Sequence, residues 1–220
     1  MCIRDRMCEC LRELCRQEQK KELTLLTGAA RETFEGFRLS YYSDQTDPNL
    51  GVSPRAVMAG TLQTCRRYAQ SFTMKSGNLL LNGNPGLGKT FLSACIARTV
   101  ADGGYSVVYE TAVHLFSCLE EAKFTDSQEA KRQAEKYTAC DLLIIDDLGS
   151  EYTNAFIASQ FFTCINERLI HRKSTIISTN LSLESLADLY TERSFSRITS
   201  SYSLLKIIGD DIRIKKKLEH

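Results

Sequence analysis

Tryptophan is absent from this 220-residue sequence, proline occurs only 3 times, and neither sign of charge is in excess, with 28 Lys and Arg against 27 Asp and Glu. The 12 glycines are too few, and the 43% of apolar residues too many, for a collagen-like, low-complexity or disordered chain. A net charge of +1 excludes a strongly basic surface, though not a local basic patch, as the basis of nucleic-acid binding. The longest apolar runs have four residues, as at 142–145, whereas a membrane helix needs roughly 18. We therefore expect a soluble, globular protein with no membrane partner.

The cysteine content favours a reducing compartment. The 9 cysteines are an odd number, and Cys95, Cys118, Cys140 and Cys164 fall in segments whose patterns predict buried helices or strand edges. Arginines interrupt every apolar stretch near the N-terminus, so no secretory signal is evident. These features predict a cytoplasmic protein.

The first 33 residues differ from the remainder. We expect a charged linker helix over 11–26 and place the main domain at 34–220. Residues 1–6, MCIRDR, resemble a sequencing or assembly artefact, with Met7 as the start, and the origin of residues 218–220 is left open. Four cysteines in this segment could supply a tetrahedral zinc site on paper, but their spacing is wrong for the usual zinc knuckles. They are Cys2, Cys8, Cys10 and Cys15.

Five short β-like runs alternate with helical patterns through the main domain. They span residues 78–83, 106–110, 141–146, 174–179 and 203–208. Before the first run, Ser53 and Pro54 supply the N-cap and the first position of another predicted helix. Continuously apolar strands between helices form a parallel sheet that is covered on both faces. The sequence thus predicts an α/β fold with a five-stranded parallel sheet and helices on both faces.

A phosphate-binding loop is predicted at 83–90, where GNPGLGKT matches the pattern GxxxxGK[ST] between a strand and a helix. Its residues are Gly83, Asn84, Pro85, Gly86, Leu87, Gly88, Lys89 and Thr90. The glycines let backbone N–H groups approach phosphate oxygens, and the following helix directs its N-terminal dipole at the same charge. Lys89, which we expect outside the core, would reach the β and γ phosphates of ATP, and Thr90 would hold Mg²⁺. The alternative, a glycine-rich turn with a chance lysine, is disfavoured because all fixed positions and both flanks fit.

Two carboxylates follow the apolar run of the third predicted strand. Asp146 and Asp147 in DLLIIDDLG would emerge at the carboxyl edge of a buried strand, beside the phosphate loop. Asp146 is expected to bind Mg²⁺, mostly through water, and Asp147 to orient or polarise the attacking water. Adjacent carboxylates are also common as plain turn residues, and the phosphate loop upstream is what favours the functional interpretation.

Residues 34–214 resemble the DnaC/DnaI/IstB branch of AAA+ P-loop ATPases, the bacterial helicase loaders and transposition helper ATPases. The resemblance is carried by GNPGLGKTFLSACIA, LLIIDDLG, IISTN, ERSFSRI and GDDIR. It implies that Asn180 is a sensor that helps to place the hydrolytic water. It also implies that Arg197 is an arginine finger for a neighbouring subunit's site and that Arg213 is the sensor II arginine at the nucleotide. For these two arginines, and for Arg193, the alternative is a solvated helix face or a structural ion pair.

The chain departs from the family pattern in two ways. Most AAA+ proteins have Glu where this chain has Asp147, so we expect slow hydrolysis, although Asp is familiar in this branch. Few residues follow the last predicted strand, so no full C-terminal lid domain is expected, and Arg213 would act from a short tail. In addition, residues 7–23 resemble the exit of the zinc-binding domain of DnaI-type loaders. This favours a truncated chain that lacks its helicase-binding domain over a complete zinc site.

Two basic clusters are candidates for contact with single-stranded DNA. They comprise Arg168, His171, Arg172 and Lys173, and then Lys215, Lys216 and Lys217. The first cluster ends a predicted helix, and complementing the helix dipole there is the favoured role.

Other side chains have weaker claims to the site. His114 lies in an amphipathic helix and is expected at the surface or core edge rather than as a ligand. Phe37, Tyr41 and Tyr42 precede the nucleotide core, and in related proteins that segment approaches the adenine. Ordinary core packing is the alternative for all three aromatic residues.

The resemblance implies an ATPase switch that loads the replicative DNA helicase. ATP and Mg²⁺ would bind, subunits would assemble into a homo-oligomer, with weak or transient contact to single-stranded DNA, and hydrolysis would release a partner. The alternative is a transposition helper that acts on duplex DNA and a transposase. A P-loop kinase for a small metabolite is disfavoured by Asn180, and a nucleotide-binding scaffold that does not hydrolyse is left open.

Overall fold

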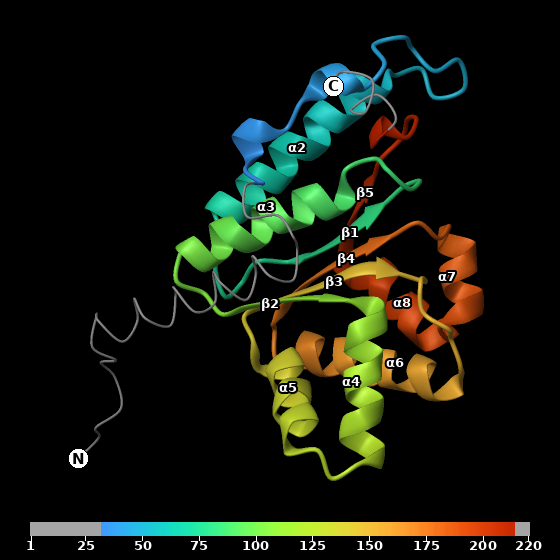
Figure 1. Ribbon diagram of the computed structural model, residues 1–220. Helices are drawn as coiled ribbons and strands as arrows, with labels where there is room; N and C mark the ends of the chain where they lie inside the picture. Colours follow the sequence, from blue (N-terminus) through green and yellow to red (C-terminus); the bar gives the residue numbers. More distant parts are fainter. Residues whose placement is uncertain (1–31, 214–220) are drawn as a thin grey trace.

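A five-stranded parallel sheet forms the centre of the computed structural model, which describes residues 32–213 (Figure 1). The strands are β1 (Asn78–Asn82), β2 (Val107–Thr111), β3 (Leu142–Leu148), β4 (Ser174–Thr179) and β5 (Tyr202–Lys206). They lie in the order β2-β3-β4-β1-β5, and every neighbouring pair is parallel. This order brings the segments that follow β1, β3 and β4 together at the carboxyl edge of the sheet, where such folds bind ligands. The predicted five-stranded parallel sheet is confirmed.

Helices cover both faces of the sheet, as predicted (Figure 1). One face carries α2 (Pro54–Gln70) and α3 (Lys89–Asp102), preceded by the 3-10 turns η1 (Phe34–Gly36) and η2 (Leu39–Tyr41). The opposite face carries α4 (Ala112–Phe124), α5 (Gln128–Ala139), α6 (Ala155–Ile170), α7 (Leu183–Leu189) and α8 (Glu192–Ser201). The fold is therefore a three-layer α/β arrangement.

Alternating side chains of the strands build a separate core on each face. Leu79 and Leu81 of β1 pack in the core under α2 and α3, whereas Leu80 packs in the core on the opposite face. Leu143 and Ile145 of β3 join Leu80 in that second core. Because both faces of each central strand are covered, the strands need continuous apolar runs, and each buried leucine or isoleucine stabilises the fold by roughly 1.5–3 kcal/mol.

The helices begin with identifiable caps, and two of the helices were not predicted from the sequence. Ser53 Oγ accepts the N–H of Ala56 at 3.2 Å and Pro54 occupies the first position of α2, as predicted. By contrast, α5 and α7 appear as additional helices in the β2–β3 and β4–β5 connections. Among the residues of α5 only Ala130 and Tyr137 are buried, so its charged sequence lacks a clear apolar stripe. With 7 residues, α7 is too short to show a helical period.

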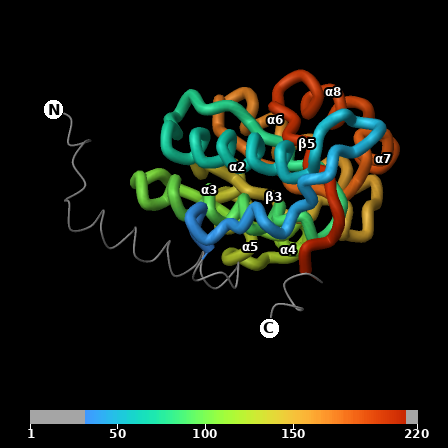
Figure 2. The backbone as a smooth tube through the Cα atoms, turned by 90° about the horizontal axis from the view of Figure 1, so that it is seen from above, coloured from blue at the N-terminus to red at the C-terminus, as the bar shows by residue number. Residues whose placement is uncertain are grey.

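Segments from the two ends of the described chain lie side by side at the carboxyl edge of the sheet. Figure 2 shows the segment before α2, in blue to cyan, passing beside the red segment that follows β5. Ile212 of the later segment lines a small cavity together with Phe37 and Tyr41 of the earlier one. This contact places the N-terminal aromatic residues beside the phosphate loop.

Several predictions fall outside the described residues, namely the linker helix over 11–26, the four N-terminal cysteines, and Lys215, Lys216 and Lys217. The cysteines within the described range are free and buried, which confirms the burial predicted for four of them. They are Cys65, Cys95, Cys118, Cys140 and Cys164. In the same range, no helix combines the length and the apolar character needed to cross a membrane.

Arg168 of α6 is wholly buried and does not belong to an exposed basic cluster. Its guanidinium donates hydrogen bonds to the carbonyl oxygens of Tyr137 (2.6 Å), Cys140 (3.1 Å) and Ser174 (2.5 Å), and to Thr175 Oγ1 (2.9 Å). The planar guanidinium fork suits this set of divergent acceptors. Arg168 lies in the last turn of α6, as the expected dipole role requires, but its buried side chain joins the end of α5 to the start of β4 and is not available for contact with DNA.

We expect Arg168→Ala to lower the free energy of unfolding by about 3 kcal/mol or more, because the substitution leaves several buried carbonyl groups without a donor. Glu167→Ala is the matched control, since Glu167 is exposed on the same helix, and it should change the stability by less than about 0.5 kcal/mol. Chemical denaturation followed by circular dichroism measures both values. Equal losses in the two variants would contradict the structural role of Arg168.

Candidate nucleotide-binding site

The segment 83–90 joins β1 to α3 and has the backbone shape of a phosphate-binding loop. Gly86 and Gly88 have φ angles of 74° and 86°, in the left-handed region that other residues rarely adopt. Gly88 is the N-cap residue of α3, so the first N–H groups of the helix face the loop. Leu87 is fully buried, and its carbonyl accepts a hydrogen bond from the Tyr42 hydroxyl at 2.8 Å. The anchored loop therefore presents a helix N-terminus to an anion.

Lys89 lies inside this loop and is only 6% exposed, which corrects the expectation that it stays outside the core. Its Nζ donates hydrogen bonds to the carbonyl oxygens of Gly83 (2.6 Å) and Asn84 (2.8 Å) and to Asn180 Oδ1 (2.5 Å). Burial lowers the pKa of Lys89, and two nearby carboxylates oppose this shift. The ammonium group is thus held by neutral oxygens that phosphate oxygens could replace, and charge-assisted bonds to phosphate are the stronger ones.

Both predicted carboxylates lie within the last residues of β3. The register between β3 and β4 shifts between Ile145 and Leu148, so Asp146 and Asp147 occupy an irregularity in the sheet. Asp147 has a φ of 58°, a left-handed conformation that Asp adopts more readily than most residues. Its Oδ1 accepts a hydrogen bond from Asn180 Nδ2 at 2.6 Å. The structure therefore brings the three predicted residues Lys89, Asn180 and Asp147 into one hydrogen-bonded chain.

Asp146 is 5% exposed and accepts a hydrogen bond from the hydroxyl of Ser178 on β4. A second hydroxyl, that of Tyr109 on β2, is buried and makes no hydrogen bond among the described residues. Burial, together with the nearby Asp146 carboxylate, raises the pKa of Tyr109. The Asp146 carboxylate is thus shielded from solvent and held by the Ser178 hydroxyl.

The donor set around Asp146 fits Mg²⁺. A carboxylate and the exposed Thr90 hydroxyl at the start of α3 are both hard oxygen ligands. Mg²⁺ commonly takes one or two carboxylates, keeps several waters and completes its shell with substrate phosphates. In the part of the chain that the structure describes, no group of three or more His, Cys, Asp or Glu could hold a metal ion alone. Asp146 and Thr90 would therefore hold Mg²⁺ together with phosphates rather than in a preformed cage.

Arg213 lies near the site but is paired with a carboxylate. Its Nε and Nη2 both donate to Asp211, and Nη2 is 2.5 Å from Oδ2. The N–H of Ile212 donates to the carbonyl of Gly86 at 3.1 Å, and a Cβ on Gly86 would lie only 2.0 Å from Asp211 Oδ1. The acidic side chain lies directly against Gly86 of the phosphate loop. The Arg213 side chain is 65% exposed, and its positive charge acts on Lys89.

Arg193 and Arg197 lie exposed on α8, one turn apart. None of the ion pairs found between described residues involves either arginine. The helix packs against α6, α7 and β5. Arg197 therefore lies on an exposed helix face.

The N-terminal aromatic residues divide between core and cavity. Tyr42 is buried and stacks on Phe37, with ring centroids 5.9 Å apart. Phe37 and Tyr41, with Phe91 and Gly88, line a cavity of about 160 Å³ beside the phosphate loop. The cavity is also lined by Arg38, and its Phe37 and Phe91 rings meet edge to face at 71°. Its aromatic walls are suited to a ring such as adenine, whereas Tyr42 supports the loop through its hydrogen bond to Leu87.

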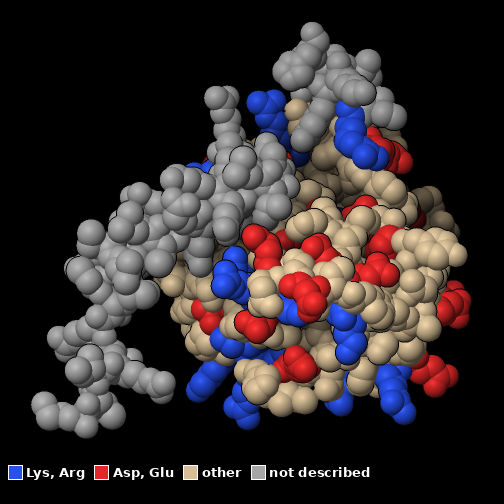
Figure 3. Space-filling view, turned by 60° about the horizontal axis from the view of Figure 1, so that its bottom comes forward, with Lys and Arg blue, Asp and Glu red and all other residues tan. Residues whose placement is uncertain are grey.

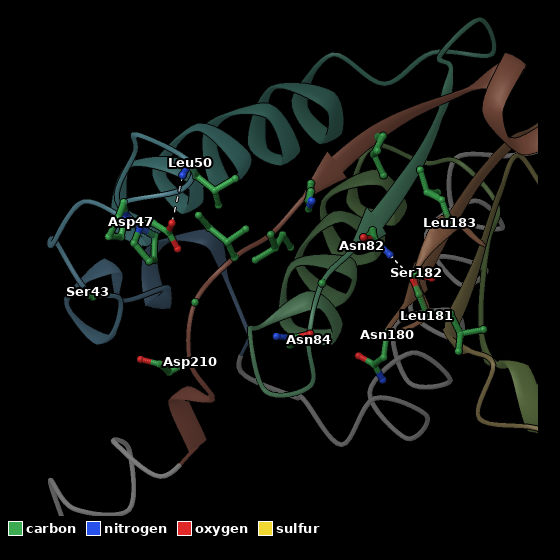
Figure 4. Close-up of a pocket in the computed structure, with 18 of the residues that line it drawn as sticks. Ser43, Asp47, Leu50, Asn82, Asn84, Asn180, Leu181, Ser182, Leu183 and Asp210 are labelled. Atoms are coloured by element: carbon green, nitrogen blue, oxygen red, sulfur yellow. Dashed lines mark hydrogen bonds between the residues drawn. The ribbon is translucent and has the colours of Figure 1, made fainter. Parts of the chain in front are cut away.

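A larger cavity of about 850 Å³ opens on the other side of the loop (Figure 4). Figure 4 shows Asn84 of the phosphate loop and Asn180 at one end of this cavity, facing the segment that precedes α2. Three carboxylates line it, those of Asp47, Glu184 and Asp210, against the single ammonium of Lys206. The cavity therefore favours a cationic group.

The predicted peripheral residues lie away from the loop. His114 is 61% exposed and bonded to a buried glutamate, as expected for a surface residue. Lys173 pairs with Asp141 at 2.8 Å, while His171 and Arg172 are exposed at the end of α6. On the face in Figure 3, which brings the α4 and α5 side forward, the Lys and Arg side chains are interspersed with Asp and Glu. The described residues of this face form no continuous basic surface for DNA.

Sequence reasoning missed Ser178, Tyr109 and Asp211 as neighbours of the site. Ser178 precedes Asn180 by two residues in ISTN, and alternate residues of a strand point the same way, so this signal was available. Tyr109 and Asp211 carry no comparable local signal. Only the assembled sheet brings them to the phosphate loop and to Asp146.

We expect Lys89→Ala to weaken ATP binding at least about tenfold, or ~1.4 kcal/mol, because it removes the cation that would face the β and γ phosphates. Lys75→Ala is the control, since Lys75 is exposed before β1, at the opposite edge of the sheet. Titration with ATP by calorimetry measures both affinities. An unchanged affinity in Lys89→Ala would refute the phosphate-loop assignment.

The family model for IstB-like ATP binding proteins matches residues 51–220. An insertion-sequence IS21 ATP-binding protein of Pseudomonas aeruginosa is 27% identical over 152 residues, which cover 67% of this chain and 56% of that protein. The replicative helicase loader DnaC of Buchnera aphidicola subsp. Schizaphis graminum is 24% identical over 144 residues, covering 65% of this chain and 58% of that protein. The chain thus spans somewhat more than half the length of these curated relatives.

A solved structure shows the same fold. The crystal structure of the DnaC helicase loader matches with a TM-score of 0.62 at 22% identity, covering 80% of this chain and 98% of that one. The region matched by the family model contains the phosphate loop, both carboxylates of β3 and Asn180. The chain therefore belongs to the IstB-like ATP-binding proteins, in the DnaC/DnaI/IstB branch of the AAA+ P-loop ATPases.

Proposed function

We propose that this protein binds and slowly hydrolyses ATP, and that the nucleotide is an assembly switch for loading the replicative DNA helicase. The observation that carries the proposal is the hydrogen-bonded chain from Lys89 through Asn180 to Asp147. These hydrogen bonds link Lys89, whose ammonium group would bind the γ phosphate, to Asp147, which would orient water. The ATPase core would comprise residues 34–220, with residues 1–33 as a linker.

ATP would bind with its phosphates in the loop at 83–90 and its base in the small aromatic cavity. Lys89 would exchange the carbonyl oxygens of its own loop for oxygens of the β and γ phosphates. Phe37 and Tyr41 would contact the base. Thr90 and Asp146 would hold Mg²⁺, which when bound neutralises charge that develops on the phosphates.

Hydrolysis would depend on Asp147 and Asn180. When Lys89 turns to the phosphates, the Asn180 amide oxygen loses its donor and becomes available to the attacking water. Asp147, held by Asn180 Nδ2, would accept a hydrogen bond from the same water and align it with the γ phosphate. A carboxylate that is short by one methylene and restrained by a neighbouring side chain supports slow turnover before a partner binds.

Assembly into a homo-oligomer would complete the site. The exposed Arg197 of one subunit would enter the nucleotide site of the next, where it would stabilise charge on the transferred phosphoryl group. The large cavity with its excess of carboxylates offers an incoming arginine a route toward Asn84 and Asn180. Arg213 would bind the nucleotide once ATP has separated it from Asp211.

A transposition helper is the second candidate function. The similarity to the IS21 ATP-binding protein supports it as strongly as the similarity to DnaC supports a helicase loader. Both candidates would use the same nucleotide switch, but they differ in the protein and in the form of DNA that they contact. Single-stranded DNA is the transient partner for the loader and duplex DNA for the helper.

Stimulation of the ATPase by DNA discriminates the two functions. We expect single-stranded DNA to raise phosphate release by the full chain in ATP and Mg²⁺ more than duplex DNA of the same sequence does. Lys89→Ala should respond to neither DNA at an ATP concentration that half-saturates the unmodified protein, because that variant binds ATP at least about tenfold more weakly. A larger response to duplex DNA would reject the loader and support the transposition helper.

Mixing two inactive variants tests assembly and catalysis together. Arg197→Ala keeps its own site intact, whereas Asp147→Asn keeps an intact arginine but cannot align water, so each should lose turnover, by ~10³-fold for the arginine. In mixed oligomers, some interfaces combine the intact nucleotide site of an Arg197→Ala subunit with the intact Arg197 of an Asp147→Asn subunit. We therefore expect ATPase activity to return. Phosphate release measured against the mixing ratio records this recovery.

Arg193→Ala is the matched control, because Arg193 is equally exposed one turn away on α8. It should keep turnover near that of the unmodified protein. No recovery in co-assembled mixtures, or unchanged turnover in Arg197→Ala, would contradict the role of Arg197 in a neighbouring site.

A further inference from the structure

Ser178 of β4 contacts both acidic residues of the site, the carboxylate of Asp146 and the backbone N–H of Asp147. Its side chain is 1% exposed. Its hydroxyl donates a hydrogen bond to Asp146 Oδ1 and accepts one from the backbone N–H of Asp147 at 2.9 Å. Neither contact belongs to the regular hydrogen bonding of the sheet, because both involve the Ser178 side chain, and the register between β3 and β4 shifts at this point.

The geometry leaves Ser178 a single arrangement of its proton. A serine hydroxyl has one hydrogen to donate and lone pairs to accept with. Because the Asp147 N–H can only donate, the hydroxyl must accept from it and direct its own hydrogen at Asp146. One oxygen of Asp146 is thereby fixed, and the orientation of the other follows from the planarity of the carboxylate.

The same hydroxyl also holds the backbone of Asp147 in its unusual conformation. Asp147 has a φ of 58° and lies in the register shift between Ile145 and Leu148, where the regular pairing of β3 with β4 is interrupted. A local hydrogen bond to the Asp147 N–H stabilises this conformation, which in turn directs its carboxylate toward Asn180.

We propose that Ser178 is a positioning residue that orients the Mg²⁺-binding carboxylate of Asp146 and couples it to the water-orienting carboxylate of Asp147. The inference rests on the proposed function and adds a residue to that site. Hydrogen-bonded partners of metal-binding carboxylates typically contribute about 10–100-fold to metal affinity. The alternative is that the Ser178 hydroxyl only supplies hydrogen bonds to polar groups that are buried between β3 and β4.

The test measures how ATP affinity depends on Mg²⁺, with a fluorescent ATP analogue and the full chain. We expect Ser178→Ala to raise the Mg²⁺ concentration at half-maximal effect about tenfold, while the affinity measured in EDTA stays within about twofold because the phosphate loop is unchanged. In the Asp146→Asn background, Ser178→Ala should cause no further shift, because its effect passes through that carboxylate.

Ser174→Ala is the matched control. Ser174 lies on the same strand, is 2% exposed, and donates its hydroxyl to the carbonyl of Ser76 at 2.7 Å, at the end of β4 far from the site. Ser174→Ala removes a buried hydroxyl, as Ser178→Ala does, so this control should lower the melting temperature without moving the Mg²⁺ midpoint.

A second pair of variants keeps the test decisive if Ser178→Ala does not fold. Ser178→Thr retains the hydroxyl, and Ser178→Val introduces a side chain with the shape of threonine but without a hydroxyl. The Thr variant should show the Mg²⁺ midpoint of the unmodified protein, and the Val variant should show the tenfold shift.

The outcomes separate the inference from the proposed function. If the unmodified protein binds ATP with no dependence on Mg²⁺, the proposed site and the inference both fail. If it does depend on Mg²⁺, but Ser178→Ala behaves like Ser174→Ala, or Thr and Val behave alike, only the role of Ser178 is refuted.

Discussion

Side-chain hydrogen bonds tie the carboxyl ends of β1, β3 and β4 together, from Lys89 through Asn180 and Asp147 to Ser178. The order of the strands makes this possible, since β4 lies between β1 and β3 and carries Ser178 and Asn180 at its end. Parallel strands bring these ends to a single edge, where backbone groups no longer pair with one another. The proposed roles of Lys89, Asp147, Asn180 and Ser178 depend on that convergence.

The network satisfies groups that would otherwise be costly to bury. Lys89 is almost inaccessible, yet its ammonium group has three oxygen partners, while the exposed Arg213 pairs with the Asp211 carboxylate. In the proposed function, phosphate binding would exchange these internal partners for ligand oxygens, so the site would pass from one hydrogen-bonded state to another rather than from an unpaired state to a paired one. Such an exchange would keep the energetic cost of switching small and would transmit the presence of ATP to Asn180 and Asp147.

The sequence predicted those parts of the fold and site whose signals are local. The five strands are short, continuous apolar runs, and the phosphate loop is a contiguous motif with fixed glycines, so neither depends on distant contacts. The resemblance to a family added Asn180, which the structure places between Lys89 and Asp147. Other features arise only in three dimensions. In the sequence, Arg168 is one of several cations at the end of a helix. Its burial depends on carbonyl groups of distant elements that accept its hydrogen bonds. The pairing of Arg213 with Asp211 likewise depends on how the segment after β5 meets the loop, and the α5 helix has too little apolar surface to be recognised from its period.

The most direct test of the account is a crystal structure of the full chain with Mg²⁺ and a non-hydrolysable ATP analogue. We expect phosphates within the loop at 83–90, Lys89 Nζ turned from Asn180 to the β and γ oxygens, and Mg²⁺ between Thr90, Asp146 and the phosphates. A nucleotide bound elsewhere, or bound phosphates with Lys89 still held by Gly83, Asn84 and Asn180, would contradict it.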